Sequence, residues 1–154
     1  MRDKMEMSGE FDVNSDAATV YSKLKDIESL AKSIPGVLKY EKAQDGKIRA
    51  DVEVGMSFIK GKFNTEIGVE EKSPGKELRM FGKGSGAGSS MDFDALFSLE
   101  DVSGSTKVKW NVSINIGGLA ATVGSRMVQR ASDKYVNDLV AAFKKACEQG
   151  RSNP

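Results

Sequence analysis

Few residues of this 154-residue chain are of a type that could carry chemistry. It has no histidine and one cysteine, Cys147, so Ser-His-Asp and Cys-His catalysis, histidine-ligated zinc and thiolate clusters are excluded. An enzyme would need carboxylates, lysine, tyrosine, water or a cofactor. Asp92 and Asp94 resemble an acid–base pair, but they alternate with Phe93 and are expected on the opposite, solvated face of a strand. We predict no catalytic residue and no metal site, and leave enzymatic activity uncertain.

A glycine run between two predicted strands is the second candidate. Gly82, Gly84 and Ala87 nearly match the dinucleotide-binding fingerprint, but that motif requires a helix to follow, and the alternating segment 91–99 predicts a strand. Glycine at every second position instead leaves one face of a strand bare. Close packing of a helix there is the favoured interpretation, and space for a ligand is the alternative.

The elements that must position these residues follow from hydrophobic periodicity. Alternation predicts a strand over 5–13, and helical spacing then predicts two short helices. Asn14, Ser15 and Asp16 are the candidate caps of the first helix; Asp26 is that of the second, which ends at Pro35-Gly36. From Val37 onward alternation predicts six more strands, with turns at Asp45-Gly46, Ser73-Pro74-Gly75 and near Gly104. Short turns between consecutive strands favour an antiparallel meander.

A long amphipathic helix is predicted from Leu119 to Cys147. Its apolar stripe has small residues in the first half and Tyr135, Leu139 and Phe143 in the second. Such a helix must cover the apolar face of the sheet, so the fold class is α+β: a curved seven-stranded antiparallel sheet wrapped around the C-terminal helix. We expect one ligand-binding domain over 1–149 and a frayed tail over 150–154.

Composition limits the partners and the compartment. Lys and Arg total 23 against 22 Asp and Glu, a net charge of +1, which argues against nucleic-acid binding. No signal peptide and no run of about 18 apolar residues is seen, so we expect a cytoplasmic protein without a transmembrane segment.

The order of elements resembles the helix-grip fold of the START-like (SRPBCC, Bet v 1-like) superfamily, and within it the G-subunit family of carbon monoxide dehydrogenase. The resemblance runs from about Met5 to Phe143 and is carried by four stretches: Ile34-Pro35-Gly36, Gly61-Lys62-Phe63, the run from Gly82 to Gly88, and Gly117-Gly118-Leu119 with Gly124-Ser125-Arg126. Val37 stands where the family often has cysteine. Many relatives continue into an apolar membrane-anchoring tail, whereas this sequence stops at Pro154, so a soluble carrier is expected.

This resemblance implies a cavity between the sheet and the last helix that holds a hydrophobic small molecule, a quinone or lipid, without catalysis. The expected lining residues share predicted inward-facing positions: Ile34, Met56, Phe63, Met91, Phe93, Trp110, Ile114, Val123, Met127 and Tyr135. Flexible Met and aromatic side chains suit an adaptable apolar pocket, although each is also compatible with an ordinary core. No cofactor is expected other than such a bound quinone or lipid.

The same resemblance implies service to a molybdenum-containing carbon monoxide dehydrogenase-like enzyme, as an accessory or carrier protein. Arg126, Arg130 and Lys134 recur at helical spacing and predict a basic line for docking to an acidic partner or lipid headgroups, with plain solvation as the alternative. Peripheral membrane contact is left open. Two other classes are retained: a superfamily enzyme of cyclase, aromatase or hydrolase type, and a protein–protein adaptor with a solid core.

Overall fold

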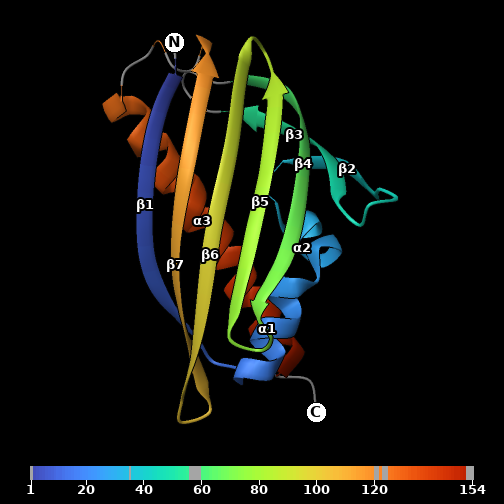
Figure 1. Ribbon diagram of the computed structural model, residues 1–154, viewed down its shortest axis with the longest axis vertical. Helices are drawn as coiled ribbons and strands as arrows, with labels where there is room; N and C mark the ends of the chain where they lie inside the picture. Colours follow the sequence, from blue (N-terminus) through green and yellow to red (C-terminus); the bar gives the residue numbers. More distant parts are fainter. Residues whose placement is uncertain (1, 35, 56–59, 120–121, 123–124, 152–154) are drawn as a thin grey trace.

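Seven strands form one antiparallel sheet that curves around the last helix (Figure 1). The computed structural model describes residues 2–34, 36–55, 60–119, 122 and 125–151. The elements in chain order are β1 (Arg2–Val13), α1 (Ala17–Lys25), α2 (Ile27–Ser33), β2 (Val37–Lys42), β3 (Ile48–Gly55), β4 (Lys60–Ser73), β5 (Glu77–Gly86), β6 (Ser89–Val102), β7 (Ser105–Gly118) and α3 (Ser125–Arg151). The predicted fold class is therefore confirmed.

The sheet has the strand order β1-β7-β6-β5-β4-β3-β2. Strands β2 to β7 are a simple meander, as the short turns predicted. β1 closes the opposite edge by pairing with β7 along its whole length, from Arg2 opposite Gly117 to Val13 opposite Thr106. The first and last strands of the sequence are thus neighbours in the sheet, and β1 and β2 are its two edge strands.

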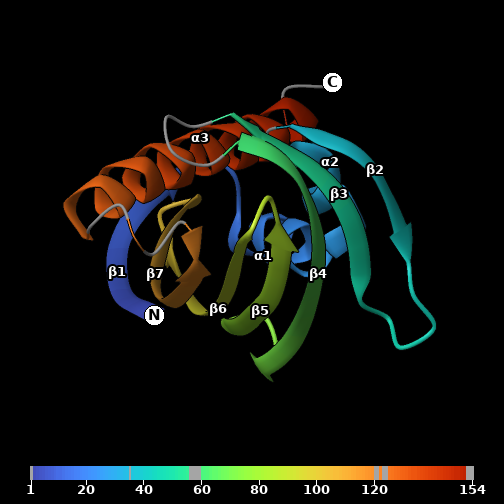
Figure 2. The ribbon, with the colours of Figure 1, turned by 90° about the horizontal axis from the view of Figure 1, so that it is seen from above.

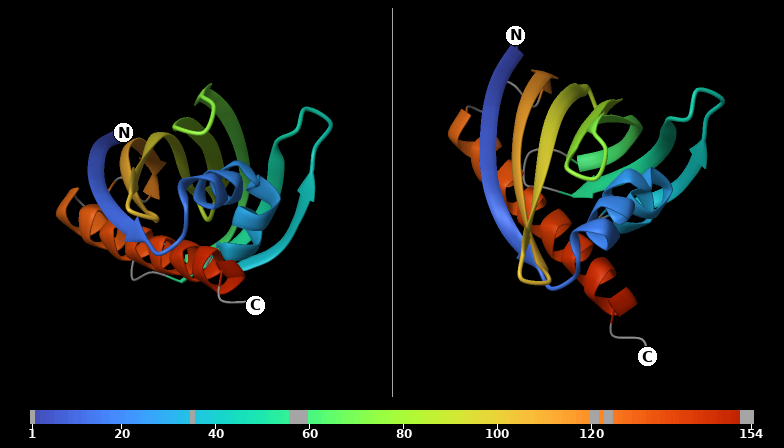
Figure 3. Two further views of the ribbon diagram at one scale, coloured as in Figure 1. Left: turned by 90° about the horizontal axis from the view of Figure 1, so that it is seen from below. Right: turned by 60° about the horizontal axis from the view of Figure 1, so that its bottom comes forward.

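Two short helices connect β1 to β2 and lie at one end of the concave face (Figure 3). The Asp16 carboxylate caps α1 by accepting a hydrogen bond from the Thr19 N–H at 2.8 Å. Asp26 ends α1 and caps α2, because its side chain accepts from the Ser29 N–H at 3.2 Å. The structure thus selects Asp16 from the three candidate caps of the first helix and confirms Asp26 for the second. Each cap satisfies a backbone donor that the first helical turn leaves without a partner.

Helix α3 crosses the open side of the curved sheet, as seen from above in Figure 2. It starts at Ser125, so the prediction that the helix begins at Leu119 is wrong. Gly118, with a φ of +76°, ends β7, and the Leu119 N–H donates to the Gly88 carbonyl at 2.9 Å. Of the residues between Leu119 and Ser125, 120–121 and 123–124 lie outside the described part of the chain. At the other end α3 continues to Arg151, beyond the predicted start of the tail at Gly150.

The buried stripe of α3 is also rotated from the predicted one. Val128 is 1% exposed and packs with Met5, Ile114 and Ile116, whereas Met127 is 47% exposed. Successive helical residues are about 100° apart, so if Val128 points at the sheet, Met127 must lie on the flank. The prediction of Met127 as an inward-facing residue is therefore wrong.

The glycines of β5 do not make room for close packing of α3. A Cβ built at Gly82 would lie 2.6 Å from the Glu66 carbonyl oxygen and 2.8 Å from a ring atom of Phe93, and one at Gly84 would lie 3.1 Å from Thr65. The favoured interpretation, close packing of the helix, is wrong at these positions, because the nearest atoms come from β4 and from Phe93 of β6. Gly82 and Gly84 lie in a strand, and the strand β6 follows, which also excludes the dinucleotide fingerprint.

Candidate functional site on the inner face of the sheet

The registers place one apolar row of every strand on the face that looks toward α3. Across the three central strands, Met80 of β5 is opposite Ala95 of β6, and Ala95 is opposite Val112 of β7. Phe93 and Ile114 form the next pair along β6 and β7. The prediction of which alternate residues of these strands face inward is therefore confirmed. Asp92 and Asp94 point to the outer face, as expected.

Two clusters close the two ends of this inner face. At the end with the short helices, α1, α3 and the sheet bury a set that comprises Val13, Val20, Tyr21, Leu24, Leu78, Val108, Phe143 and Cys147. At the opposite end, Val128 of α3 packs against Met5, Ile114 and Ile116. The helix is therefore anchored at both ends.

Between these clusters the inner face is only partly covered. Ile67, Met80 and Trp110 belong to neither buried cluster, and each is only partly buried although it faces the helix side of the sheet. In the described part of the chain the backbone of α3 approaches β1, α1 and α2 more closely than the central strands. Apolar side chains in the middle of the sheet thus keep contact with solvent beneath a helix that crosses them.

Two aromatic rings occupy inner-face positions beside glycines of a neighbouring strand. Trp110 lies where a side chain of Gly9 would begin, 2.7 Å from its ideal Cβ position, and Phe93 lies 2.8 Å from that of Gly82. A ring that extends over a neighbouring glycine covers the sheet surface instead of standing up from it. These two residues form an aromatic floor to the inner face.

Polar groups on the inner face are bonded mainly within the fold. The Thr65 hydroxyl donates to the Ala50 carbonyl at 2.9 Å, and the Tyr21 hydroxyl donates to Glu71 at 2.8 Å. Lys25 lies 3.0 Å from the same carboxylate. Hydrogen bonds from Lys25 and Tyr21 lower the pKa of Glu71, while burial and this carboxylate raise the pKa of Tyr21. The cluster of Tyr21, Lys25 and Glu71 was not predicted from the sequence, and it joins α1 to the end of β4.

The structure brings most of the predicted lining residues to one face but buries them unequally. Phe63 and Ile114 are buried; Ile34, Phe93, Trp110 and Tyr135 are partly buried. Met91 and Met127 are exposed, at 39% and 47%. Met56 and Val123 lie outside the described residues. Burial, followed by the charge of Asp138, raises the pKa of Tyr135. Ile67 and Met80 were not among the predicted lining residues, although both lie on the partly covered centre of the inner face. Their inward-facing positions in the alternating pattern could have identified them.

The predicted basic line on α3 faces away from the sheet. Arg126, Arg130 and Lys134 are all exposed, and Lys134 lies 3.4 Å from Asp138 one turn further along. Among the described residues, no helix combines the length and apolar character needed to cross a bilayer. The same residues contain no group of three or more Cys, Asp or Glu side chains placed to hold a metal ion.

Two open hollows of about 760 and 660 Å³ lie on the outer face rather than beneath α3. The larger crosses β2 to β6 and is lined mainly by polar and charged side chains such as Arg49, Asn64 and Lys83. The other contains Phe81, with the Arg79 guanidinium 4.4 Å from the ring centroid. Their polar lining does not suit the apolar ligand expected from the sequence.

A curved antiparallel sheet, two short helices after its first strand and a C-terminal helix across its apolar face define the helix-grip fold of the START-like, Bet v 1-like superfamily. A conserved protein from Geobacillus kaustophilus has a TM-score of 0.87 and 23% sequence identity, covering 94% of this chain and 96% of that chain. A START superfamily protein from Mycobacterium smegmatis has a TM-score of 0.67 and 18% identity, covering 94% and 97%. Zhui aromatase/cyclase from Streptomyces sp. R1128 has a TM-score of 0.69 and 12% identity, covering 98% of each chain.

Structural likeness at these identities establishes the fold alone. The sequence itself matches the carbon monoxide dehydrogenase G-subunit (CoxG) family over residues 9–148. The chain therefore belongs to the CoxG family, which confirms the resemblance seen in its motifs. A comparison with curated proteins finds no match.

Proposed function

We propose that this domain binds a hydrophobic small molecule, a quinone or another lipid, between the inner face of its sheet and α3, without catalysing a reaction. We further propose that it serves a molybdenum-containing carbon monoxide dehydrogenase-like enzyme as an accessory or carrier protein. The second part is supported by membership of the CoxG family. The first part is supported by the fold and by the chemistry of the inner face.

The observation that carries the proposal is the incomplete burial of Ile67, Met80 and Trp110 beneath α3. Apolar side chains in the centre of a domain are ordinarily close-packed and dry. A ligand placed over them would remove apolar area from water, which is worth about 25 cal/mol per Å². Met80 can adjust its rotamers to ligands of different outline, and the ring of Trp110 supplies a broad apolar surface.

Extraction of the natively purified protein tests the proposal most directly. Native mass spectrometry before and after organic extraction should reveal a stoichiometric apolar compound whose mass identifies its class. Addition of a short-chain quinone to the emptied protein should quench the fluorescence of Trp110, the single tryptophan of the chain. An empty extract together with an unchanged emission spectrum would contradict ligand binding.

A matched pair of phenylalanines tests where the ligand lies. Phe93 lies beside Gly82 on the inner face, and Phe81 lies beside Gly68 in the same way on the outer face, 2.7 Å from its ideal Cβ position. Phe93→Leu should weaken quinone binding roughly two- to tenfold, the range expected for an aromatic contact. Phe81→Leu should leave binding unchanged. Equal effects of the two substitutions would place the ligand elsewhere.

The carrier role requires a separate test. Affinity purification with tagged components of a carbon monoxide dehydrogenase-like enzyme should recover this chain, and loading with quinone should change the affinity. Recovery of a stable complex by a protein that never binds an apolar ligand would instead support an adaptor. Turnover of the bound molecule would support the enzyme alternative.

A further inference from the structure

The two edge strands of the sheet differ in how well they are protected from pairing with another chain. β2 is six residues long, and its ladder with β3 has a register shift between Val37 and Lys39. β1 is twelve residues long and pairs with β7 without any register shift. A short or bulged edge discourages further strand pairing, whereas a long regular edge favours it. β1 is therefore the edge of this sheet that is suited to accept another strand.

The outer edge of β1 is open. The strand order places β7 on one side of β1 and no strand of the described chain on the other. α3 crosses the inner face of β1, and its first turns extend past the strand in both Figure 1 and Figure 2. The backbone N–H and C=O groups of β1 that point away from β7 are thus left without a partner in the sheet.

The side chains of β1 do not protect this edge. The exposed charged residues of the described part, Lys4, Glu6, Glu10 and Asp12, alternate with a row that faces α3. Prolines and inward-pointing charges are common means of blocking an edge strand, and the segment 4–13 has neither.

We propose that two copies of this chain associate by antiparallel pairing of their β1 strands. The two-fold axis is perpendicular to the sheet and passes between Met7 and Met7 of the second copy. In this register Lys4 lies opposite Glu10 of the second copy, and Glu6 lies opposite its Ser8. The two sheets join into one, with both inner faces on the same side.

Charge selects this register from its neighbours. Shifting the pairing by two residues in one direction opposes Glu6 to Glu10 of the second copy, and shifting it in the other direction opposes Glu6 to Glu6. Like charges directly opposite each other are destabilising. A shift by one residue would turn the apolar row of one copy to the outer face. Only the proposed register among these has Lys4 opposite Glu10 and no like-charge pair between them.

The new pairs continue a ladder that exists within each copy. Glu10 is opposite Lys109 of β7, and Lys4 is opposite Asn115. Glu10 therefore lies between Lys109 of its own chain and Lys4 of the second copy. Charges of alternating sign across neighbouring strands stabilise the join.

The inner face gives the association a spectroscopic signal. Met5 of the second copy lies opposite Gly9, over which the Trp110 ring extends. Because Val128 packs on Met5, the overhanging turns of α3 meet the second copy near its Gly9 and Trp110. Association therefore removes water from the indole edge. The emission maximum of Trp110 should move to shorter wavelength as the protein concentration rises.

Sedimentation equilibrium measures the association itself. A contact made mainly by one strand pair falls in the class of small, transient interfaces, below about 1,200 Å². We therefore expect a reversible equilibrium in which the mass rises from 16.6 kDa toward twice that value over roughly 5 to 500 μM. Purified protein without added ligand is used.

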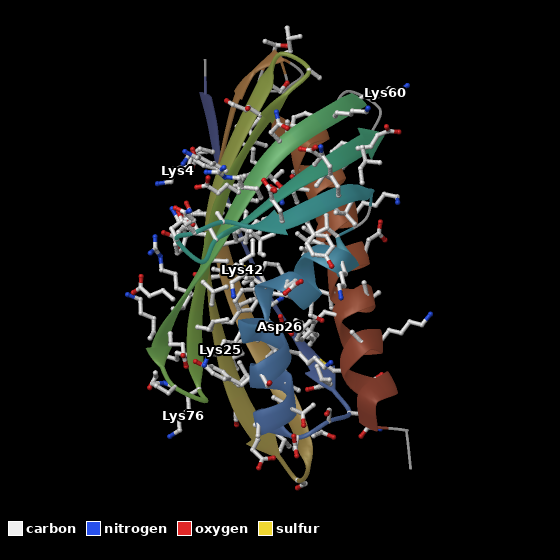
Figure 4. The ribbon with its side chains drawn as sticks, turned by 90° about the vertical axis from the view of Figure 1, so that its right-hand side faces the viewer. Lys4, Lys25, Asp26, Lys42, Lys60 and Lys76 are labelled. Atoms are coloured by element: carbon white, nitrogen blue, oxygen red, sulfur yellow. The ribbon has the colours of Figure 1, made fainter. Side chains whose placement is uncertain are left out.

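Charge reversal tests the register. Lys4→Glu opposes two acidic side chains at both symmetric positions and should weaken association roughly tenfold. Figure 4 shows Lys4 on the side of the sheet away from α3, so this change spares the packing of the helix. Lys42→Glu makes the same change in net charge at an exposed position of the other edge strand and should have no effect.

A double reversal separates pairing from a general effect of charge. Lys4→Glu combined with Glu10→Lys exchanges the two charges and should restore association to within about threefold of the wild type. Glu10→Lys also opposes Lys109 within its own chain, so thermal unfolding of each variant checks that the fold is intact.

Cross-linking locates the two-fold axis. In the proposed register the two Cα atoms at position 7 lie about 4.5–5.5 Å apart, within the range of a disulfide. The two Cα atoms at position 8 are diagonal neighbours, about 7–8 Å apart, which is beyond that range. Met7→Cys should therefore form a disulfide-linked dimer after mild oxidation, and Ser8→Cys much less. Cys147 is buried, so the wild type should form none.

The outcomes separate this pairing from ligand binding. A chain that is monomeric at every concentration would overturn the proposal, as would cross-linking of Ser8→Cys in place of Met7→Cys. A β1 edge that pairs only with a segment of a different protein would overturn it as well. The pairing requires no ligand, so an empty organic extract would count against the proposed function and not against the dimer.

Discussion

The indole of Trp110 occupies the space above Gly9, its partner across the β1–β7 ladder, so closely that a Cβ on Gly9 would lie 2.7 Å from its Cζ2 atom. Contact this short cannot be accommodated without movement of the ring. Gly9 is therefore what allows Trp110 to extend over β1 on the inner face.

Replacement of Gly9 should displace this ring. Gly9→Ala is expected to lower the free energy of unfolding by about 1–3 kcal/mol, as overpacking does, and to shift the Trp110 emission maximum. The measurement is urea unfolding followed by fluorescence. Gly55→Ala is the control, because a Cβ at Gly55 would meet nothing within 4 Å. Equal stabilities of the two variants would show that the indole has room to move.

Stability should fall at high pH because of Cys147. The thiol is 0% exposed, and burial raises its pKa to about 11, while an unfolded thiol has a pKa of about 8.5. The unfolded state thus loses this proton first, so the contribution to stability is present below about pH 8.5 and is lost as the pH rises toward 11. The loss should reach about 3 kcal/mol, at 1.36 kcal/mol per pKa unit.

The control for this prediction is Cys147→Ala. Burial also raises the pKa of Tyr21 and Tyr135, which add a decline of the same sign at higher pH. The difference between wild type and Cys147→Ala in urea unfolding from pH 8 to 11 isolates the thiol. A constant difference across this range would mean that Cys147 ionises as readily in the folded state as in the unfolded one.

Acid should weaken an ion-pair cluster on the outer face. Arg79 binds Asp94 through two hydrogen bonds of 2.8 and 2.9 Å and Glu70 through one of 3.1 Å. The Arg79 hydrogen bond is the largest cause that lowers the pKa of Asp94, so its contribution is present above pH 4 and is lost as the pH falls through the lower folded value.

Because Asp94 is half exposed, this contribution should stay below about 1 kcal/mol. Arg79→Lys keeps the charge but cannot form the paired hydrogen bonds, and it should recover less than half of the stability lost in Arg79→Met. Denaturant unfolding at pH 7 and pH 3 gives the comparison. If all three proteins had the same pH dependence, the pair would contribute nothing.

The two helix caps should each stabilise the fold. Asp16→Ala and Asp26→Ala remove the acceptors for Thr19 and Ser29, and each should cost about 1 kcal/mol in thermal or urea unfolding. Asp16→Ser and Asp26→Ser retain a side-chain acceptor and should keep most of the stability that the alanine variants lose. Asp12→Ala, at an exposed strand position, should change stability by less than about 0.5 kcal/mol. Loss in the serine variants as large as in the alanine variants would argue against the capping role.

Local patterns in the sequence predicted the elements of this fold well, because they depend on neighbours in the chain. Alternation gave the phase of β6, including the outward direction of Asp92 and Asp94, and side-chain chemistry gave the caps at Asp16 and Asp26. The pairing of β1 with β7 was not visible, since it joins residues about a hundred positions apart. The start of α3 was predicted at Leu119 instead of Ser125 because Leu119, Val123 and Met127 continue the four-residue spacing of the helix.

The same contrast between features set by neighbouring residues and features set by distant residues applies to the inner face. Alternation places Phe93, Trp110 and Ile114 on one side of the sheet, but it cannot tell how far α3 stands from them. That separation depends on packing at the two ends, where Val128 and Phe143 anchor the helix. Nor does the sequence show that Gly82 makes room for Phe93, because the two residues meet only when β5 and β6 pair.

The pairing of the first strand with the last has a consequence for synthesis of the protein. Strand β1 leaves the ribosome first but must wait for β7, about a hundred residues later, which takes on the order of 5–20 s at typical rates of synthesis. During that time its alternating Met, Phe and Val residues have no partner strand. Non-local pairing of this kind is slow, and the nascent chain with an unpaired β1 is the species that a chaperone would have to protect from aggregation.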